Sequence, residues 1–465
     1  MIDLSKLWEH QKATYEFGKD KLAVLDASDP GIGKTLAHIK LAEYHLEQGG
    51  SRVVVTCPKT LVRSAWLREV SEHAGSMKIA LAEAPEATRI AAFESKANLV
   101  VLNVDGLKWL EDQPKRWLKK YLGPRAMLIN DESHLLKNPE ALRTKAALKL
   151  APMFERRHCL SGTMAPNSVV ELWTQTKLVD DGKRLGTRFT AFRNLMQYPV
   201  MKGPRVEWTD KSDSRNMVYL LLQDIMIRHN FDDVMKNVPD MEHRVMLYEP
   251  TKAHKKLYDQ LELQSYLEAK DKTITAVNAA VLANKLLQVA SGAVYNDAEG
   301  EERSWTVVDK GRYELIGELV AGRQHSLVFF LWKHQRVLLE DEFKKRKIRY
   351  TVIDGSVKKG SDREKIISDY QDGKYDTLLL HPKSAEHGIT LTRASSVILA
   401  SPVYEASSLK QMAARIRRGT QDKLTEFITI LAEGTRDEQA YDVMSGKKAR
   451  LEDLNFLFEG RICPQ

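Results

Sequence analysis

Two groups of short, apolar segments constrain most strongly how this chain can fold. The first group comprises KLAVLDAS, RVVVTCP, NLVVLNV, AMLINDE and RHCLSGT, and the second comprises SLVFFLW, RYTVIDG, DTLLLHP, SVILASP and FITILAEG. Each segment has about the length of a buried parallel strand, and helical patterns such as LVRSAWLREVSEHA and RVLLEDEFKKR lie between them. Strands that alternate with helices predict parallel sheets covered by helices on both faces. We therefore expect two α/β domains in tandem.

The segment between the two groups has a different pattern. The stretch that begins TKAHKKLYDQLELQSYLEAK has helical periodicity and no strand signal. We therefore assign residues 1–240 to the first α/β domain, 241–300 to a helical connector and 301–465 to the second α/β domain. Because no long Gly/Ser linker separates them, we expect the two domains to be held close with a cleft between them.

Composition narrows the class of protein. The 465-residue chain is 43% hydrophobic, which suits globular cores, and its formal net charge of +8 suits a polyanion such as nucleic acid, although good solubility would explain the charge equally well. No apolar run approaches the roughly 20 residues of a membrane helix, and the start MIDLSKLWEH lacks a signal-peptide pattern. Cys57, Cys159 and Cys463 are far apart, which predicts reduced thiols. We expect a cytoplasmic protein without a membrane partner.

A glycine-rich loop follows the first strand-like segment. It reads Asp29-Pro30-Gly31-Ile32-Gly33-Lys34-Thr35 and precedes a helical pattern. Backbone N–H groups at such a helix start can cradle the phosphates of ATP, with Lys34 reaching the β- and γ-phosphates and the Thr35 hydroxyl binding Mg²⁺. Ser28 stands where the usual pattern has its first glycine, so an ordinary turn before a helix is the alternative.

Two adjacent carboxylates end another strand-like segment, AMLIND. Asp131 and Glu132 lie about a hundred residues after the loop, at the strand end where α/β sheets bind ligands. Asp131 would hold Mg²⁺, and Glu132 would orient and deprotonate the attacking water. A surface acidic turn is the alternative, but the upstream Gly-Lys-Thr in the right order favours a nucleotide site.

Two further patterns fit ATP hydrolysis. Ser161 and Thr163 follow a strand and can sense the γ-phosphate through hydrogen bonds, although Ser-Gly-Thr is also an ordinary turn. Gln411, Arg415 and Arg418 are spaced to share one helix face. An arginine that reaches ATP across a cleft stabilises the transition state, whereas a solvated basic face is the alternative.

In this order, the patterns resemble the superfamily-2 helicases and most of all their Swi/Snf branch. LWEHQKATYEF resembles the adenine-recognising glutamine motif, with Gln11 as its glutamine, and VVVTCPKTLVRSAWLREV resembles motif Ia, with Trp66. DASDPGIGKT, INDESHLLKNP, LSGTMAPNSVVELW, HPKSAEHGITLTRASSVILASP and QMAARIRRGTQ resemble motifs I, II, III, V and VI, and MIRHNFDDVMKNVPDMEHR resembles the branch's bridge between lobes. Departures from the branch are Ser133, His387, Arg417 and Gly419-Thr420.

The resemblance implies two RecA-like lobes with an ATP cleft between them. Lobe 1 would supply Lys34, Thr35, Asp131 and Glu132, and lobe 2 would supply Arg415 and Arg418. The family resemblance places DNA-backbone contacts at Lys59 and Thr60 of motif Ia and at Gly388 and Thr390 of motif V.

The activity implied is ATP-dependent translocation along duplex DNA, with remodelling of branched DNA in fork regression, branch migration, recombination or repair. The alternatives are a strand-separating DNA or RNA helicase, a translocase that displaces bound proteins, and a scaffold with a relict ATP site. The intact ATP-site residues oppose the scaffold. No unwinding pin is evident in the sequence, and residues 187–215 lie outside the motifs. Protein partners stay unknown.

Overall fold

The computed structural model describes residues 2–165, 167–202, 205–270, 284–296, 304–357, 360–385, 390–402 and 411–442. These residues form two units: unit 1 contains the described residues up to Lys236, and unit 2 contains those from Asn237 onward. Within the described residues, no helix is both long and apolar enough to cross a membrane. Each unit is an α/β body built on a parallel sheet, as the strand pattern predicts.

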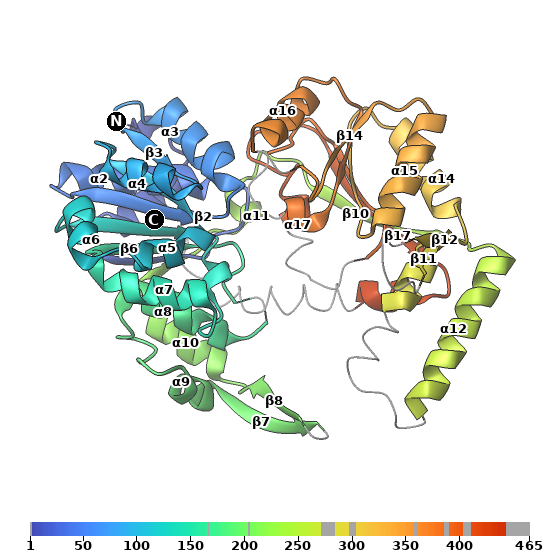
Figure 1. The fold of residues 1–465 in the computed structure, drawn as a ribbon, viewed down its shortest axis with the longest axis horizontal. Helices are drawn as coiled ribbons and strands as arrows, with labels where there is room; N and C mark the ends of the chain where they lie inside the picture. The colour runs from blue at the N-terminus through green and yellow to red at the C-terminus, as the bar shows by residue number, and fades with distance from the viewer. Residues whose placement is uncertain are drawn as a thin grey trace. The chain divides into compact units, whose positions relative to one another are not determined.

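The sheet of unit 1 has seven parallel strands in the order β3-β4-β2-β5-β6-β1-β9 (Figure 1). Its strands are β1 (Ala23–Asp26), β2 (Arg52–Cys57), β3 (Ile79–Ala82), β4 (Leu99–Asn103), β5 (Ala126–Asp131), β6 (Arg156–Leu160) and β9 (Met226–Ile227). Because β2, β5, β6 and β1 are parallel neighbours, the loops after them leave the same edge of the sheet. Every candidate motif of unit 1 except the glutamine motif follows one of these four strands.

Helices cover both faces of this sheet. The helical segments are η1 (Leu4–Lys6), α1 (Glu9–Gly18), α2 (Lys34–Glu47), η2 (Val62–Leu67), α3 (Arg68–His73), α4 (Glu86–Glu94), η3 (Val104–Gly106), α5 (Leu107–Glu111), α6 (Lys115–Leu122), η4 (Ser133–Leu136), α7 (Leu142–Leu150), η5 (Ala151–Met153), η6 (Val169–Glu171), α8 (Leu172–Asp180), α9 (Phe189–Met196), α10 (Ser214–Leu222) and α11 (Phe231–Val234). The sheet is buried on both sides because its strands carry continuous apolar runs.

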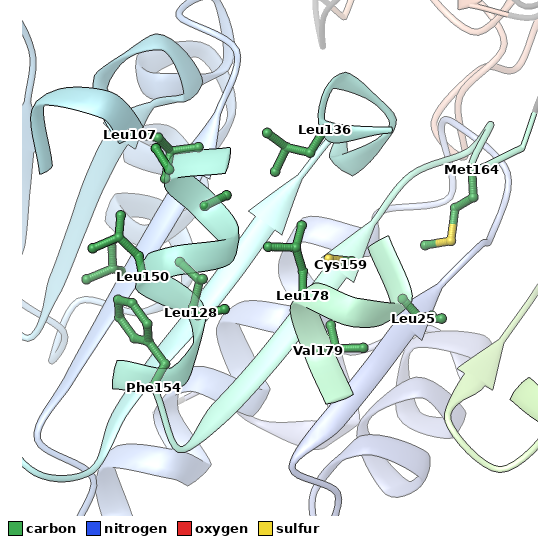
Figure 2. Close-up of a cluster of buried hydrophobic side chains, with 14 of the residues drawn as sticks. Leu25, Leu107, Leu128, Leu136, Leu150, Phe154, Cys159, Met164, Leu178 and Val179 are labelled. Atoms are coloured by element: carbon green, nitrogen blue, oxygen red, sulfur yellow. The ribbon is translucent and has the colours of Figure 1, made fainter. Parts of the chain in front are cut away.

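Two hydrophobic cores reflect the alternation of side chains along the strands. Val53 and Val55 of β2 pack on one face with Ile39 of α2 and Trp66 of η2. Val54 faces the opposite core. Figure 2 shows that second core, in which side chains from several helices meet strands β1, β5 and β6. The labelled residues there are Leu25, Leu107, Leu128, Leu136, Leu150, Phe154, Cys159, Met164, Leu178 and Val179.

A β-hairpin extends from unit 1 between α9 and α10 (Figure 1). Its strands are β7 (Gln197–Lys202) and β8 (Arg205–Asp210), which pair in antiparallel register with Gln197 opposite Asp210 and Met201 opposite Val206. This hairpin is not foreseen in the sequence, because its residues show neither a motif nor a long apolar run.

The sheet of unit 2 has six parallel strands in the order β10-β17-β16-β13-β15-β14. Its strands are β10 (Met241–Tyr248), β13 (Ser326–Phe329), β14 (Tyr350–Ile353), β15 (Thr377–Leu380), β16 (Ser396–Leu399) and β17 (Thr425–Ala432), and β11 (Ala293–Tyr295) pairs with β12 (Trp305–Val307) in a separate ribbon. The helices are α12 (Lys252–Lys270), α14 (Gly311–Ala321), α15 (Lys333–Lys345), α16 (Gly360–Gln371) and α17 (Pro382–Ala385), and residues 284–290, 411–413 and 436–442 are also helical.

Two predictions about the connector need correction. Residues 241–248, assigned from the sequence to the helical connector, form β10, which pairs with β17 along its whole length. Residues 293–295 of the same segment form β11. β10 is not predicted because it is an edge strand with mostly exposed side chains: its first half, MEHR, is largely polar, and apolar residues fill only its second half, VMLY. Residues 252–270 are helical, as predicted.

Candidate nucleotide-binding site

The glycine-rich loop joins β1 to α2, as a phosphate-binding loop does. Gly31 and Gly33 have φ angles of 90° and 79°, which lie in the left-handed region that favours glycine. A Cβ atom on Gly33 would lie 2.4 Å from Nε2 of Gln11. The backbone conformation therefore favours glycine at position 33, and a side chain there would displace the Gln11 amide.

Lys34 lies at the first position of α2, and its ammonium group is turned back onto the loop. Its Nζ donates to the carbonyl oxygens of Ser28 at 2.6 Å and Asp29 at 3.0 Å. These acceptors hold the charge over the loop, where a bound phosphate would compete for the same protons. Thr35, the predicted Mg²⁺ ligand, is the next residue of the helix and is half-buried.

Ser28 has a structural role at the position of the missing glycine. Its side chain is buried, its Oγ accepts from the backbone N–H of His229 at 3.0 Å, and its own N–H donates to Asp26 Oδ1 at 3.0 Å. The serine therefore ties the loop to the strand before it and to the segment after β9. The departure from the usual pattern is compensated by these hydrogen bonds.

Asp29 fixes the loop through a contact that spans most of unit 1. Its carboxylate accepts from Arg228 Nη2 at 3.2 Å and from the backbone N–H of Phe231 at 3.0 Å. Arg228 also donates to the carbonyl oxygen of Ala27 at 3.0 Å. The carboxylate of Asp29 holds the loop in place, and its nucleotide binding stays a prediction.

Gln11 bridges the start of α1 and the loop. Its Oε1 accepts from the backbone N–H of Trp8 at 2.9 Å, and its Nε2 donates to the carbonyl oxygen of Gly33 at 3.0 Å. An amide oxygen has a second lone pair and an amide nitrogen has a second proton. Gln11 can therefore keep these bonds and still offer one acceptor and one donor to an adenine ring.

Asp131 ends β5 and is buried. Trp66 Nε1 donates to its Oδ2 at 2.9 Å, and the backbone N–H of Glu132 donates to its Oδ1 at 3.0 Å. Burial and the neighbouring charge of Glu132 raise the pKa of Asp131 to about 7, while Trp66 and Lys34 act in the opposite direction. Without a bound cation, the Asp131 carboxylate therefore has too little positive charge nearby to ionise at the pH usual for aspartate.

Glu132 has a strained backbone and a histidine partner. Its φ of 55° lies in the left-handed region, which is uncommon for a residue other than glycine. Its Oε2 lies 3.2 Å from Nδ1 of His134, and that nitrogen lies 3.0 Å from Oγ of Ser161. The turn directs Glu132 away from the course of β5, so the two adjacent carboxylates have separate surroundings.

The predicted γ-phosphate sensor lies beside this pair. Ser161 and Thr163 follow β6, and the backbone N–H of Thr163 donates to Ser161 Oγ at 3.1 Å. Ser133, one of the departures from the family pattern, donates its hydroxyl to Gln175 at 2.7 Å and packs the turn against α8. The structure thus links the Ser-Gly-Thr turn to Glu132 through His134, a contact not foreseen in the sequence.

The residues present fit a magnesium ion carried by a nucleotide. Within the described residues, no group of three or more His, Cys, Asp or Glu side chains is arranged to hold a metal by itself. Mg²⁺ takes one or two protein oxygens together with substrate phosphates and water. The buried Asp131 carboxylate, with its raised pKa, and the Thr35 hydroxyl match that requirement.

The remaining predicted residues are distributed between the units. In unit 1, Lys59 is exposed and Thr60 is half-buried, and both follow β2 at the edge that carries the loop and the carboxylates. In unit 2, Thr390 is half-buried, and Gly388 lies outside the described residues. The two free cysteines in the described residues, Cys57 and Cys159, are buried, and Cys463 lies outside them.

The arginine segment of unit 2 is not a continuous helix, which corrects the predicted shared helix face. Residues 411–413 are helical, and tighter turns follow. Arg415 is buried, and its Nε donates to the carbonyl oxygen of Gln411 at 2.7 Å. The carbonyl oxygen of Arg415 accepts from Leu391 at 2.9 Å, and that of Ile416 accepts from Gln421 at 3.0 Å. The backbone N–H groups of Arg415 and Ile416 bond only three residues back, to the carbonyl oxygens of Met412 at 3.1 Å and Ala413 at 3.2 Å, so the regular helix ends before Arg418.

Comparison with known proteins identifies the family. The SNF2-related domain matches residues 14–292, and the helicase conserved C-terminal domain matches residues 311–420. Putative protein p41 of Acyrthosiphon pisum secondary endosymbiont phage 1 is 29% identical over 449 residues, which are 91% of this chain and 92% of that protein.

Longer relatives match as well. SWI/SNF-related matrix-associated actin-dependent regulator of chromatin subfamily A-like protein 1 of Xenopus laevis is 26% identical, with 93% of this chain and 43% of that protein covered. DNA annealing helicase and endonuclease ZRANB3 of Mus musculus is 24% identical, with coverage of 90% and 38%. The chain thus spans less than half the length of these two relatives.

Among solved structures, the Sulfolobus solfataricus SWI2/SNF2 ATPase core in complex with dsDNA aligns over 97% of this chain and 92% of that chain, with a TM-score of 0.45 and 18% identity. The two domain matches together cover most of the chain, and the first alone covers more than half. The chain belongs to the SNF2-related family of helicase-type, DNA-dependent ATPases.

Proposed function

We propose that this protein hydrolyses ATP to move along duplex DNA and that it remodels branched DNA. The observation that carries this proposal is the assembly, at one edge of the unit 1 sheet, of the phosphate loop, the Asp131-Glu132 pair and the Ser-Gly-Thr turn. The relative ZRANB3 is named a DNA annealing helicase and endonuclease, which supports action on the pairing of DNA strands. Fork regression and branch migration are the reactions that we propose within this class.

In this mechanism the loop and α2 bind the phosphates of ATP. Lys34 would exchange its two carbonyl acceptors for phosphate oxygens, and Asp131 and Thr35 would hold Mg²⁺, which supplies positive charge to the phosphates when bound. Glu132, oriented by its turn and by His134, takes the proton of the attacking water. Ser161 touches His134 and would transmit the state of the γ-phosphate to the segment that follows it.

We assign the charge-stabilising arginines to unit 2. Arg415 and Arg418 would neutralise charge that develops on the transferred phosphoryl group, a role worth about 10³–10⁵ in rate in other phosphoryl-transfer enzymes. Gln411 would position Arg415, because its carbonyl oxygen accepts from the guanidinium group. The match of QMAARIRRGTQ to motif VI supports this assignment.

DNA would be held mainly through its phosphates. Lys59 and Thr60 follow β2, and Gly388 and Thr390 belong to the motif V segment; lysine, hydroxyl and backbone N–H groups position a strand without reading bases. Binding is then independent of sequence.

The test measures ATP hydrolysis by the purified protein without nucleic acid and with single-stranded DNA, linear duplex or a four-way junction of equal nucleotide content. Strong stimulation by duplex or junction is expected. Stimulation by single strands or RNA alone would instead indicate the strand-separating helicase. In Glu132→Gln, turnover should fall by about 10²–10⁴ because the general base is lost, while binding of a fluorescent ATP analogue is retained. Wild-type turnover by this variant would refute the general-base assignment.

A further inference from the structure

The β7-β8 hairpin belongs to none of the motifs that bind ATP or the DNA backbone. It lies in the segment 187–215, which has six Lys or Arg residues and three Asp or Glu residues. Figure 1 shows it extending from unit 1 beyond α9 and α10. Because the hairpin extends away from the sheet and lies in a mostly basic segment, we expect it to have a role other than packing.

The base of the hairpin is bonded to the segment that follows the Ser-Gly-Thr turn. Asp210 accepts from the Ser168 hydroxyl at 2.5 Å and from the backbone N–H of Val169 at 3.1 Å. Gln197, directly opposite Asp210 in the ladder, donates to Ser168 Oγ at 2.9 Å and to Asp210 Oδ1 at 2.8 Å. This network begins only five residues after Thr163 in the chain, so the base of the hairpin is attached close to the predicted γ-phosphate sensor.

The lower part of the hairpin is also held by α9. The guanidinium group of Arg193 lies 4.1 Å from the ring centroid of Trp208, and Lys211 Nζ donates to the carbonyl oxygens of Asn194 at 3.0 Å and Leu195 at 2.7 Å. A cation over a tryptophan face is a favourable contact. The hairpin is therefore fixed at its base and does not hang from a single turn.

The outer part of the same face is apolar and exposed. Along an antiparallel ladder, alternate pairs share a face, so the Met201–Val206 pair lies on the face of Gln197 and Asp210. Gln197 is buried, whereas Met201 is 69% exposed and Val206 is 51% exposed. An apolar cross-strand pair at the outer end of an anchored hairpin has the form of a wedge.

The charge of the segment favours nucleic acid as the occupant. One of the three acidic residues, Asp210, already accepts hydrogen bonds from Ser168 and Val169 at the base of the hairpin. Lys202 and Arg205 occupy the register position next to the apolar pair, on the outer side. Proteins that open base steps insert Met, Leu, Ile, Phe or Pro side chains between bases and hold the flanking phosphates with basic residues. An apolar pair with adjacent basic positions matches that chemistry.

We propose that the β7-β8 hairpin is a wedge that enters branched DNA at the junction of its strands, with Met201 and Val206 contacting the terminal base pair. This inference rests on the proposed function, because only a protein that moves along duplex DNA drives such a wedge forward. ATP hydrolysis moves the duplex, and the hairpin separates or redirects the strands at the branch.

The test compares the double variant Met201→Ser/Val206→Ser with the wild-type protein. Both side chains are exposed, so the change leaves the core intact. The matched control is Leu142→Ser on α7, where an equally apolar side chain is 73% exposed outside the hairpin. Hydrolysis stimulated by linear duplex should stay near the wild-type rate in both variants.

Two readouts report on the branch itself. A 2-aminopurine base at the branch point should brighten when wild-type protein binds without ATP, and the wedge variant should lose this signal. ATP-driven conversion of a labelled fork should fall about tenfold or more in the wedge variant, because serine side chains do not offset the cost of unstacking the terminal base pair. The Leu142→Ser protein should behave as wild type in both assays.

The outcomes separate this inference from the proposed function. If duplex DNA stimulates hydrolysis but the wedge variant converts forks at the wild-type rate, the wedge is overturned while the translocase stands. A face that instead docks a protein partner would give the same result. If no DNA stimulates the wild-type protein, the proposed function fails first.

Discussion

At the level of single residues, hydrogen bonds between side chains and loops hold the site in shape. Trp66 donates to Asp131, Arg228 holds Asp29, and Gln11 holds Gly33. Each of these hydrogen bonds fixes the position of a residue in the candidate nucleotide-binding site. Asp131 illustrates the cost: burial near Glu132 raises its pKa to about 7, so a functional carboxylate destabilises the protein until a cation is bound.

This cost predicts a pH-dependent gain in stability for Asp131→Asn. In the unfolded chain, the pKa of Asp131 is near the ordinary aspartate value of 3.8, whereas in the folded protein its pKa is raised to about 7. Between these values the folded state holds more protons, so the contribution of Asp131 to stability falls as the pH rises to about 7 and is constant above it. Asparagine has no such titration and can still accept from Trp66.

The thermal midpoint of nucleotide-free Asp131→Asn should therefore exceed that of wild type by a few degrees more at pH 8 than at pH 5.5. The exposed Asp105→Asn serves as the control, and its difference from wild type should not grow with pH. An equal difference at both pH values for Asp131→Asn would contradict the buried, pKa-shifted carboxylate. Mg²⁺ with ATP should stabilise wild type and leave the variant nearly unchanged.

At the scale of elements, the parallel order of strands brings the motifs together. β2, β5, β6 and β1 are neighbours, so loops that are far apart in the chain leave one edge of the sheet. The hairpin is likewise placed by contacts between distant segments, because Asp210 and Gln197 bond to the segment after β6. The proposed γ-phosphate sensor is thus close in the chain to the segment that anchors the proposed wedge.

This attachment predicts that Asp210→Ala uncouples hydrolysis from remodelling. The change leaves Ser168 and Val169 without their carboxylate acceptor and frees the base of the hairpin. DNA-stimulated hydrolysis should persist, while the number of ATP molecules consumed per fork converted should rise about tenfold, in line with the 1–3 kcal/mol cost of an unsatisfied group.

The control for this experiment is Thr209→Ala, an exposed neighbour on the opposite face of the ladder. It should consume ATP and convert forks in the wild-type ratio. If Asp210→Ala also keeps the wild-type ratio, the hydrogen-bonded path from the Ser-Gly-Thr turn to the hairpin carries no coupling.

At the scale of the whole molecule, charge sets how DNA is held. The chain carries a formal net charge of +8, and its proposed backbone contacts come from both units. Phosphate contacts release counterions, so they weaken steeply with salt and carry no sequence information. Under the proposed function, specificity for branched DNA would come from the hairpin and not from base recognition.

The salt dependence of DNA stimulation tests this view. With about five phosphate contacts, the DNA concentration for half-maximal stimulation should rise by a factor on the order of 10²–10³ between 50 and 200 mM salt. Lys59→Ala should lower the log–log slope by about one, whatever the DNA sequence. The exposed Lys115→Ala on α6 is the control, and an unchanged slope for Lys59→Ala would remove this lysine from the DNA contact.

Strands and turns that depend only on neighbouring residues can be predicted from the amino-acid sequence. Apolar runs predict the central strands, because a buried parallel strand needs side chains that are apolar on both faces. Gly31 and Gly33 mark a left-handed turn, and the adjacent Asp131 and Glu132 mark a strand end. The two parallel sheets follow from these local rules, and the structure confirms them. The phosphate-binding role of the loop stays a prediction.

The tertiary structure alone decided which distant residues meet. Trp66 and Asp131 are 65 positions apart, and Arg228 and Asp29 are 199 apart, so no local pattern pairs them. β10 joins β17 although only its second half, residues 245–248, is apolar, because an edge strand is held by backbone hydrogen bonds that any residue except proline can make. Hydrophobic periodicity records which face of an element is buried, but the partner that buries it depends on how the whole chain packs.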